Sequence, residues 1–458
     1  MRRPSRFLSP VAENQHCKLE PARCSRKTAL ARIRAIQDWQ EIRLVDRTNP
    51  VTAIKNRDRS GSAIEVLLAF AKLGVSCFGG PIAHIGYFRQ EFVVRRCWLD
   101  EHAYADLVAL CQFLPGPASS QVGFSLGLMR AGYFGGLAAW VGFTLPSAIA
   151  LVFFAYGASA LKGEIGSGLL HGLKLVAVAI VAQAVWGMAR TLCPDRERAS
   201  IAVVAALIVL LTSSSSVAQI GAIIFGGIAG LWLCRGAAAT KSNEGHMSVP
   251  VSRPVALSAL AAFFLLLLGL PVLSTLTHSQ GVALFEAFYR SGALVFGGGH
   301  VVLPLLRDAT VAHGWVSDDV FLAGYGAAQA VPGPLFTFSA YLGAVMGPPP
   351  NGAAGAAISL VAIFVPGILA LVATLPFWET FRRQAMAQAI MRGVNAAVVG
   401  LLGAALYSPV WTSSVEGPGS FAIALVGFVL LTVWEAPPLV VVAISAIGGV
   451  VLAVAKFS

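Results

Sequence analysis

The sequence predicts an all-α integral membrane protein, with about 13 transmembrane helices and two re-entrant or broken segments in two inverted repeats. Hydrophobic residues make up 56% of the chain and charged residues only 12%, whereas soluble domains carry roughly 25% charged residues. Several apolar runs, such as 137–157, 255–275 and 436–456, are long enough to cross roughly 30 Å of hydrocarbon. The third observation is an internal repeat.

The positive charge of the chain is concentrated at its N-terminus. Residues 1–60 contain 14 Lys/Arg and 6 Asp/Glu, so +8 of the net charge of +11 lies there. We expect residues 1–61 to form a basic, disordered extension on the cytoplasmic side, where Lys and Arg accumulate and can meet anionic lipid. Since the excess is confined to this segment, it does not indicate a nucleic-acid partner.

The second half of the chain repeats the first. The segment 68–81 returns as 286–299, and the Pro-Gly-Pro triplet at 115–117 returns at 332–334. The matches run in order with small gaps over most of both halves. Repeats of this kind are typical of secondary transporters, whose halves are related by a pseudo-two-fold axis with the substrate where they meet.

These matches divide the chain into four parts. Residues 62–235 form the first transporter repeat and residues 284–458 form the second. Residues 236–283 are a linker that contains one extra transmembrane helix, the run 255–275. A single extra crossing is what an inverted pair of repeats requires.

The distribution of arginines also favours inverted topology. Basic residues prefer cytoplasmic loops. In the first repeat they follow the run 167–190, whereas in the second repeat they precede the equivalent run and the later stretch 407–418 has none. The arginines concerned are Arg190, Arg196, Arg198, Arg382, Arg383 and Arg392. Equivalent loops are therefore expected on opposite sides of the membrane.

The first apolar segment of each repeat is expected to be re-entrant. Residues 63–78 are followed by a Gly-Gly-Pro break and then by Arg89, Arg95 and Arg96. A segment that enters the membrane and turns back at the break keeps these arginines cytoplasmic. Such irregular backbone is tolerated at membrane depth only where protein or water covers it.

Four helix breaks, in two matched pairs, are the candidate binding site. Glycine permits unusual backbone angles and proline removes a helix donor. Helix N-termini freed at such breaks offer N–H groups and a partial positive charge, which suit an oxyanion. The alternative is that these residues only kink and pack helices. The candidate residues, including the hydroxyl that follows the first triplet, are Phe78, Gly79, Gly80, Pro81, Pro115, Gly116, Pro117, Ser119, Phe296, Gly297, Gly298, Gly299, Pro332, Gly333 and Pro334.

Two pairs of polar side chains match between the repeats. Lys72 and Arg290 precede the glycine breaks. Cations in lipid are costly and tend to face a cavity or partner, so this pair is expected to attract a doubly charged anion; the alternative is snorkelling to the interface. Gln112 and Gln329 can hydrogen-bond an oxyanion or cap backbone groups.

Arg89 and Arg307 also match between the repeats, whereas the remaining ionisable candidates have no acidic or histidine counterpart in the opposite repeat. Lys174 aligns with Asn395, which is consistent with a polar spot lining the pathway. If transport is coupled to protons, candidate carriers are available, although a structural role is favoured for each alone. These candidates are Glu65, His84, Asp106, His171 and His300.

The combination of motifs resembles the chromate ion transporter family, in its long-chain form with two homologous halves. The resemblance covers about 62–456 and is carried by Phe78-Gly79-Gly80-Pro81, Leu114-Pro115-Gly116-Pro117, Phe296-Gly297-Gly298-Gly299-His300 and Val331-Pro332-Gly333-Pro334. It implies a multi-pass protein of the inner (plasma) membrane that exports chromate from the cytoplasm, as an antiporter, and so confers resistance. It implies no cofactor and no enzymatic activity.

Three other functions stay open at this stage. A carrier of sulfate or another tetrahedral oxyanion would use the same kind of site, which separates similar dianions poorly. A membrane chromate reductase would need a cofactor motif, and the sequence has no G-x-G-x-x-G after a strand and no C-x-x-C-H. A channel would conduct without a coupled ion. The expected partners are the anion and the lipid bilayer; proton or membrane-potential coupling and the oligomeric state, a homodimer included, stay open.

Overall fold

The computed structural model describes residues 61–158, 163–212, 216–234, 250–296, 299–378 and 384–455, which belong to the compact unit Ser60–Ser458. Over these residues the chain forms helices and connections, without a strand. The predicted extension at 1–60, and Gly297 and Gly298 of the second glycine break, lie outside the described residues.

The first half contains seven α-helices and a π-helical turn. They are α2 (Ala63–Ser76), α3 (Gly80–Phe88), η1 (Arg89–Arg95), α4 (Glu101–Phe113), α5 (Ala118–Ala158), α6 (Gly163–Leu192), α7 (Arg196–Leu211) and α8 (Ser216–Leu233). The long helix α5 is two helices in sequence, because Ala131 and Gly132 have non-helical backbone angles.

The second half follows the same order after the connecting helix α9 (Arg253–Thr277). Its elements are α10 (Gln280–Ala293), η2 (Gly299–Val301), α11 (Val302–Thr310), α12 (Asp318–Ala328), η3 (Leu335–Thr337), α13 (Phe338–Val345), α14 (Gly352–Thr374), η4 (Leu375–Phe377), α16 (Ala385–Ala405), η5 (Leu406–Trp411), α17 (Pro418–Thr432) and α18 (Pro438–Ala455). Thus α2 corresponds to α10, α6 to α16, and the pair α7–α8 to α17–α18.

The helices confirm the predicted membrane class. Among the described residues, six helices are long and apolar enough to cross a membrane, and three shorter apolar helices accompany them. The connecting helix α9 is one of the six, and only 11% of its apolar 18-residue stretch is buried within the protein. A surface so apolar requires lipid around it. The total of about 13 spans stays a prediction.

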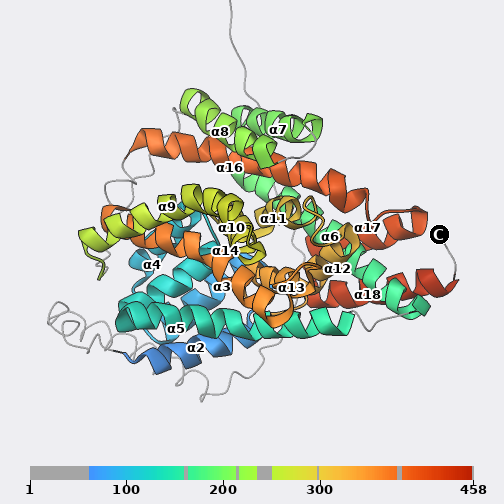
Figure 1. The fold of residues 1–458 in the computed structure, drawn as a ribbon, viewed down its shortest axis with the longest axis horizontal. Coiled ribbons are helices and arrows are strands. Elements are labelled where there is room, and N and C mark those ends of the chain that lie inside the picture. The colour runs from blue at the N-terminus through green and yellow to red at the C-terminus, as the bar shows by residue number, and fades with distance from the viewer. Residues whose placement is uncertain are drawn as a thin grey trace, which may run out of the picture. The chain divides into compact units, whose positions relative to one another are not determined.

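The two halves exchange helices. The pair α7 and α8 of the first half packs on α16 of the second, and α17 and α18 of the second half pack on α6 of the first (Figure 1). In Figure 1, α7 and α8 lie beside α16, far from α2 and α5. The sequence repeats are therefore interleaved in space, since α6 and α16 are each covered by a helix pair of the other half.

Small residues make these exchanged contacts possible. A methyl group at Gly172 of α6 would overlap the Ser445 carbonyl of α18. A methyl group at Gly226 of α8 would lie 2.7 Å from the carbonyl oxygen of Gly393 in α16. In membranes such close backbone approach replaces the hydrophobic driving force that water would supply. The glycines at these positions thus fix which helices can pair.

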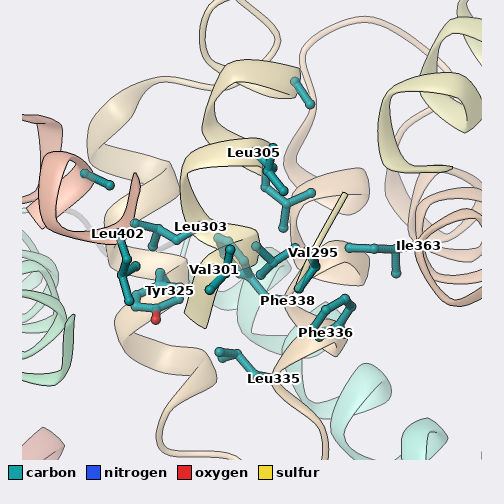
Figure 2. Packing of buried hydrophobic residues seen from close by; sticks show 14 of the residues in the cluster. Val295, Val301, Leu303, Leu305, Tyr325, Leu335, Phe336, Phe338, Ile363 and Leu402 are labelled. Carbon is teal, nitrogen blue, oxygen red and sulfur yellow. The ribbon is translucent and has the colours of Figure 1, made fainter. Parts of the chain in front are cut away.

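A hydrophobic cluster surrounds the second glycine break. Val295 before the break and Val301 after it belong to the same buried cluster as Phe336, Phe338 and Ile363. Figure 2 shows Phe336 of η3, Phe338 of α13 and Ile363 of α14 close to Val295 and Val301 on either side of the break. The helical hydrogen bonds are interrupted at the break. The close packing of these buried side chains therefore holds the irregular backbone segment in place.

Candidate substrate-binding site

The four helix breaks meet through two equivalent backbone hydrogen bonds. Gly116 donates its N–H to the carbonyl of Val295 at 2.8 Å, and Gly333 donates its N–H to the carbonyl of Cys77 at 2.9 Å. Each Pro-Gly-Pro triplet therefore contacts the glycine break of the opposite half. The residues paired in this way are equivalent in the repeat, so the contact has approximate two-fold symmetry.

The two glycine breaks also approach each other. A methyl group at Gly299 would lie 3.3 Å from Cγ of Pro81. Gly79 and Gly80 have φ values of +97° and +76°, a left-handed conformation that side chains disfavour. This is why α2 ends at the break and α3 starts afresh, with Gly79 as its N-cap and Pro81 in its first turn. Phe78 and Phe296 are each partly buried beside these breaks.

The Pro-Gly-Pro triplets end α4 and α12 in the same way. Gly116 and Gly333 have φ values of +108° and +100°. Pro117 and Pro334 are buried, whereas Pro115 and Pro332 are partly exposed. The carbonyl of Pro115 accepts a hydrogen bond from the Gln121 side chain at 2.9 Å, and the same side-chain amide donates to Gly367 of α14 at 2.8 Å.

Several buried hydroxyls near these triplets have no hydrogen-bond partner within the described part of the chain. They are Ser120, Ser125, Thr144 and Ser339, each at most 5% exposed. Ser119, singled out in the sequence, is also buried, at 2% exposure. An unsatisfied buried polar group costs about 1–3 kcal/mol. Their presence beside the breaks indicates a polar region that a ligand or water can satisfy.

The matched cations lie in different surroundings. Lys72 is exposed on the same helix as the exposed apolar residues Leu68 and Val75. Arg290 pairs with Glu286 at 3.2 Å and lines a crevice of about 10 Å³. Lys72 is not among the residues that line this crevice.

The matched glutamines are placed differently as well. Gln112 is exposed near the end of α4. Gln329 is partly buried at the C-cap of α12, next to the hydroxyl of Tyr325, which shares a 2.7 Å hydrogen bond with His300. This short polar chain belongs to the second half alone, since Ile82 and Val108 stand at the positions that match His300 and Tyr325.

A cavity of about 830 Å³ lies between the two halves. The first half contributes α5 and α6, and the second half contributes α12, α13, α17 and α18. Its polar and charged lining residues are Tyr156, Ser167, His171, Lys174, Asp319, Tyr341, Glu416 and Ser420. None of the break residues that the structure describes lines it.

Lys174 is the buried charge of this cavity. Its ammonium group donates to Asp319 Oδ1 at 2.9 Å and to the carbonyl of Ser413 at 3.4 Å. The Lys174 side chain is 10% exposed and the Asp319 side chain 74% exposed. His171, one helical turn before Lys174, shares a 3.0 Å hydrogen bond with Ser420. The cavity therefore joins a buried cation to a carboxylate that solvent reaches.

Matched ion pairs hold the helices that lead to the Pro-Gly-Pro triplets. Arg89 pairs with Glu101 at 2.6 Å in the first half, and Arg307 pairs with Asp318 at 2.8 Å in the second. Both carboxylates belong to the first turn of a helix, α4 or α12. The equivalent arginines thus hold the starts of these two equivalent helices.

These features define the class of protein. The chain is a multi-pass membrane protein whose two repeated halves interleave around a common set of helix breaks and a polar cavity. The chain belongs to the Chromate transporter family, which matches residues 64–231 and again residues 282–450. The double match confirms the resemblance predicted from the motifs.

Similar proteins cover most of the chain. A chromate transport protein of Pseudomonas aeruginosa is 28% identical over 397 residues, which are 84% of this chain and 90% of the relative. A probable chromate transport protein of Synechococcus elongatus is 27% identical over 390 residues, 83% of this chain and 93% of the relative. An uncharacterized transporter of Methanocaldococcus jannaschii is 22% identical over 366 residues, 78% of this chain and 87% of the relative. No solved structure matches the chain.

Proposed function

We propose that this protein is a secondary transporter that exports chromate from the cytoplasm across the plasma membrane and so confers chromate resistance. The observation that carries the proposal is the family match over both halves, together with relatives named as chromate transport proteins that align with 83–84% of the chain.

The anion binds at the paired breaks in this proposal. The breaks join the two halves through the Gly116–Val295 and Gly333–Cys77 hydrogen bonds, as expected of a transporter site at a repeat interface. Free N–H groups at helix starts and the unpartnered hydroxyls of the buried serines and Thr144 supply donors for an oxyanion. An acceptor-only dianion satisfies donors of this kind.

Inverted topology is part of the proposal. The first helix of the first half starts beside Arg130, at the break (Ala131 and Gly132) where the second segment of α5 begins. There Gly61 donates its N–H to the Arg130 carbonyl at 3.1 Å. The first helix of the second half starts beside Pro350, close to the start of α14. The start of α14 lies beside Tyr156, near the other end of this second segment of α5. Equivalent helices that begin at opposite ends support opposite orientations in the membrane.

The side of the protein where Arg130 lies is the cytoplasmic side in this arrangement. Arg130 and Arg96 gather there around Glu65, and positive residues favour the cytoplasm. The cavity lies at the other end, because it is lined by Tyr156 of α5 and by the start of α6. The cavity is therefore expected to face outward, as required for release of an exported anion.

Chromate uptake by everted membrane vesicles tests the function. We expect accumulation that depends on an imposed proton gradient or membrane potential and that vesicles without the protein lack. Excess sulfate as competitor reports whether both dianions use one site. Uptake of sulfate without uptake of chromate would reject chromate as the substrate. Absence of both would reject oxyanion export.

A further inference from the structure

We propose that Lys174 is the cation of an oxyanion-binding site in the outward cavity, and that Asp319 is a tethered competitor that occupies this cation when the site is empty. The inference rests on the proposed oxyanion transport and places a second binding position on the path, apart from the breaks. Neither Lys174 nor Asp319 belongs to the break residues.

The first argument is the unequal burial of the two partners. Lys174 lies in α6 with a side chain 10% exposed, whereas the Asp319 side chain is 74% exposed. A buried cation among membrane helices requires an anionic or carbonyl partner. Asp319 contacts the Lys174 ammonium group from the exposed edge of the cavity and keeps most of its hydration. It can therefore exchange for another oxyanion without a large desolvation cost on its own side.

The second argument is the set of groups around the ammonium. The carboxylate on Lys174 shows that an oxyanion fits at this position, since Asp319 Oδ1 lies 2.9 Å from Nζ. The Ser420 hydroxyl, at 6% exposure, and His171 line the same cavity and share a hydrogen bond of 3.0 Å. The volume of about 830 Å³ leaves room for an anion that keeps part of its water shell.

The third argument is the distribution of charge. Lys174 is the buried charge of the lining, while the carboxylates of Asp319 and Glu416 are exposed. Exposed carboxylates are screened by water and salt. They therefore weaken the binding of an anion at Lys174 without preventing it. A weak outer site with its own competitor favours release, because Asp319 returns to Lys174 as the anion leaves.

The test is direct binding of sulfate and of chromate to the purified full-length protein in detergent, measured by isothermal titration calorimetry. The variants are Lys174→Gln, Lys174→Arg and Asp319→Asn. Removing the cation should weaken binding at least about tenfold, a charge-preserving Arg should retain it, and removing the competitor should tighten it about tenfold. Arg198→Gln, which breaks the Arg198–Asp195 ion pair at the start of α7, is the matched control and should bind like the parent protein.

Each outcome decides the proposal. Unchanged affinity in Lys174→Gln, or unchanged or weaker affinity in Asp319→Asn, would overturn it. If Lys174→Gln does not fold, the retained affinity expected for Lys174→Arg and the tighter affinity expected for Asp319→Asn still decide. If binding depends on Lys174 but the protein moves no chromate in vesicles, the Lys174 site is supported and the transport function is rejected. If the protein transports chromate but binding does not depend on Lys174, the transport function is supported and the Lys174 site is rejected.

Discussion

The backbone N–H of Gly116 donates to the carbonyl of Val295 at 2.8 Å, and this bond ties the first half of the chain to the broken segment of the second. Its equivalent runs from Gly333 to Cys77 at 2.9 Å. Each half thus satisfies a backbone carbonyl that the other half leaves free at its break. Irregular backbone survives at membrane depth on this condition, so neither set of breaks is expected to form without the other.

The glycines of the two triplets should differ in their tolerance of a side chain. Gly116 has φ +108°, and a methyl group there would lie 2.8 Å from Cα of Gly367. At Gly333, with φ +100°, the methyl group would lie 2.8 Å from the Ser147 hydroxyl, which can rotate away, and 3.2 Å from the Phe143 carbonyl oxygen. The left-handed backbone alone costs roughly 1–2 kcal/mol. Gly116→Ala should therefore lower the free energy of unfolding more than Gly333→Ala.

Thermal unfolding in detergent and chromate uptake measure this difference. Gly187→Ala is the control, since nothing lies within 4 Å of a methyl group at that helical position and alanine favours a helix. It should keep or raise the melting temperature. Equal melting temperatures for Gly116→Ala and the parent would show that the Gly367 contact does not restrict this position.

Much of the fold was predictable because its signals are local or repeated. The lengths of the apolar runs predicted a membrane protein. The matched Pro-Gly-Pro triplets predicted the positions of breaks that the structure brings together. The exchange of α7–α8 and α17–α18 between the halves was not predictable, because it depends on contacts such as Gly172 with Ser445 between remote segments. Repetition in sequence does not say which copy a helix packs against.

The cavity was missed for a related reason. Its central pair, Lys174 and Asp319, comes from opposite halves, and neither residue has a charged partner nearby in the sequence that would reveal the pairing. The alignment of Lys174 with Asn395 and the choice of His171 as a candidate proton carrier were separate signals of polar positions there. Searching for matched residues favoured Lys72 and Arg290, whereas the cavity is built from residues that differ between the repeats.

The ion pair of the second half should contribute more stability than its equivalent in the first. Arg307 makes two hydrogen bonds to Asp318, at 2.8 and 3.0 Å, with side chains 27% and 33% exposed. Arg307→Gln should lower the free energy of unfolding by about 1–2 kcal/mol. Arg89→Gln should have a smaller effect, since Arg89 and Glu101 are each about half exposed and salt screens such pairs.

Denaturation in low and high salt separates these two variants. The loss in Arg307→Gln should persist at high salt, whereas any loss in Arg89→Gln should fade. The opposite ranking would mean that the partly buried geometry of the Arg307 pair does not strengthen it.

The interleaved halves should assemble from separate chains. Co-expressed fragments 1–245 and 246–458 should purify together, because α16 is covered by α7 and α8, and α6 by α17 and α18. Gly172→Val should weaken this association, since its side chain would overlap the Ser445 carbonyl. Co-purification through a tag on one fragment measures it, with Gly187→Val as the matched control on the same helix. Fragments that purify separately and remain folded would contradict the exchange of helices.

Labelling with a membrane-impermeant thiol reagent tests which way the cavity faces. Glu416 is an exposed residue of the cavity lining, and we expect Glu416→Cys to react from outside intact cells. Cys97 is exposed beside Trp98, whose ring packs under Arg130 at 5.4 Å, and it should react only in everted vesicles. Each thiol is placed alone in a background that lacks the other cysteines.

The N-terminal charge and the arginines around Glu65 predict this orientation through their preference for the cytoplasm. Reaction of Cys97 in intact cells, with Glu416→Cys protected, would reverse the orientation and turn the cavity into an entrance for the exported anion.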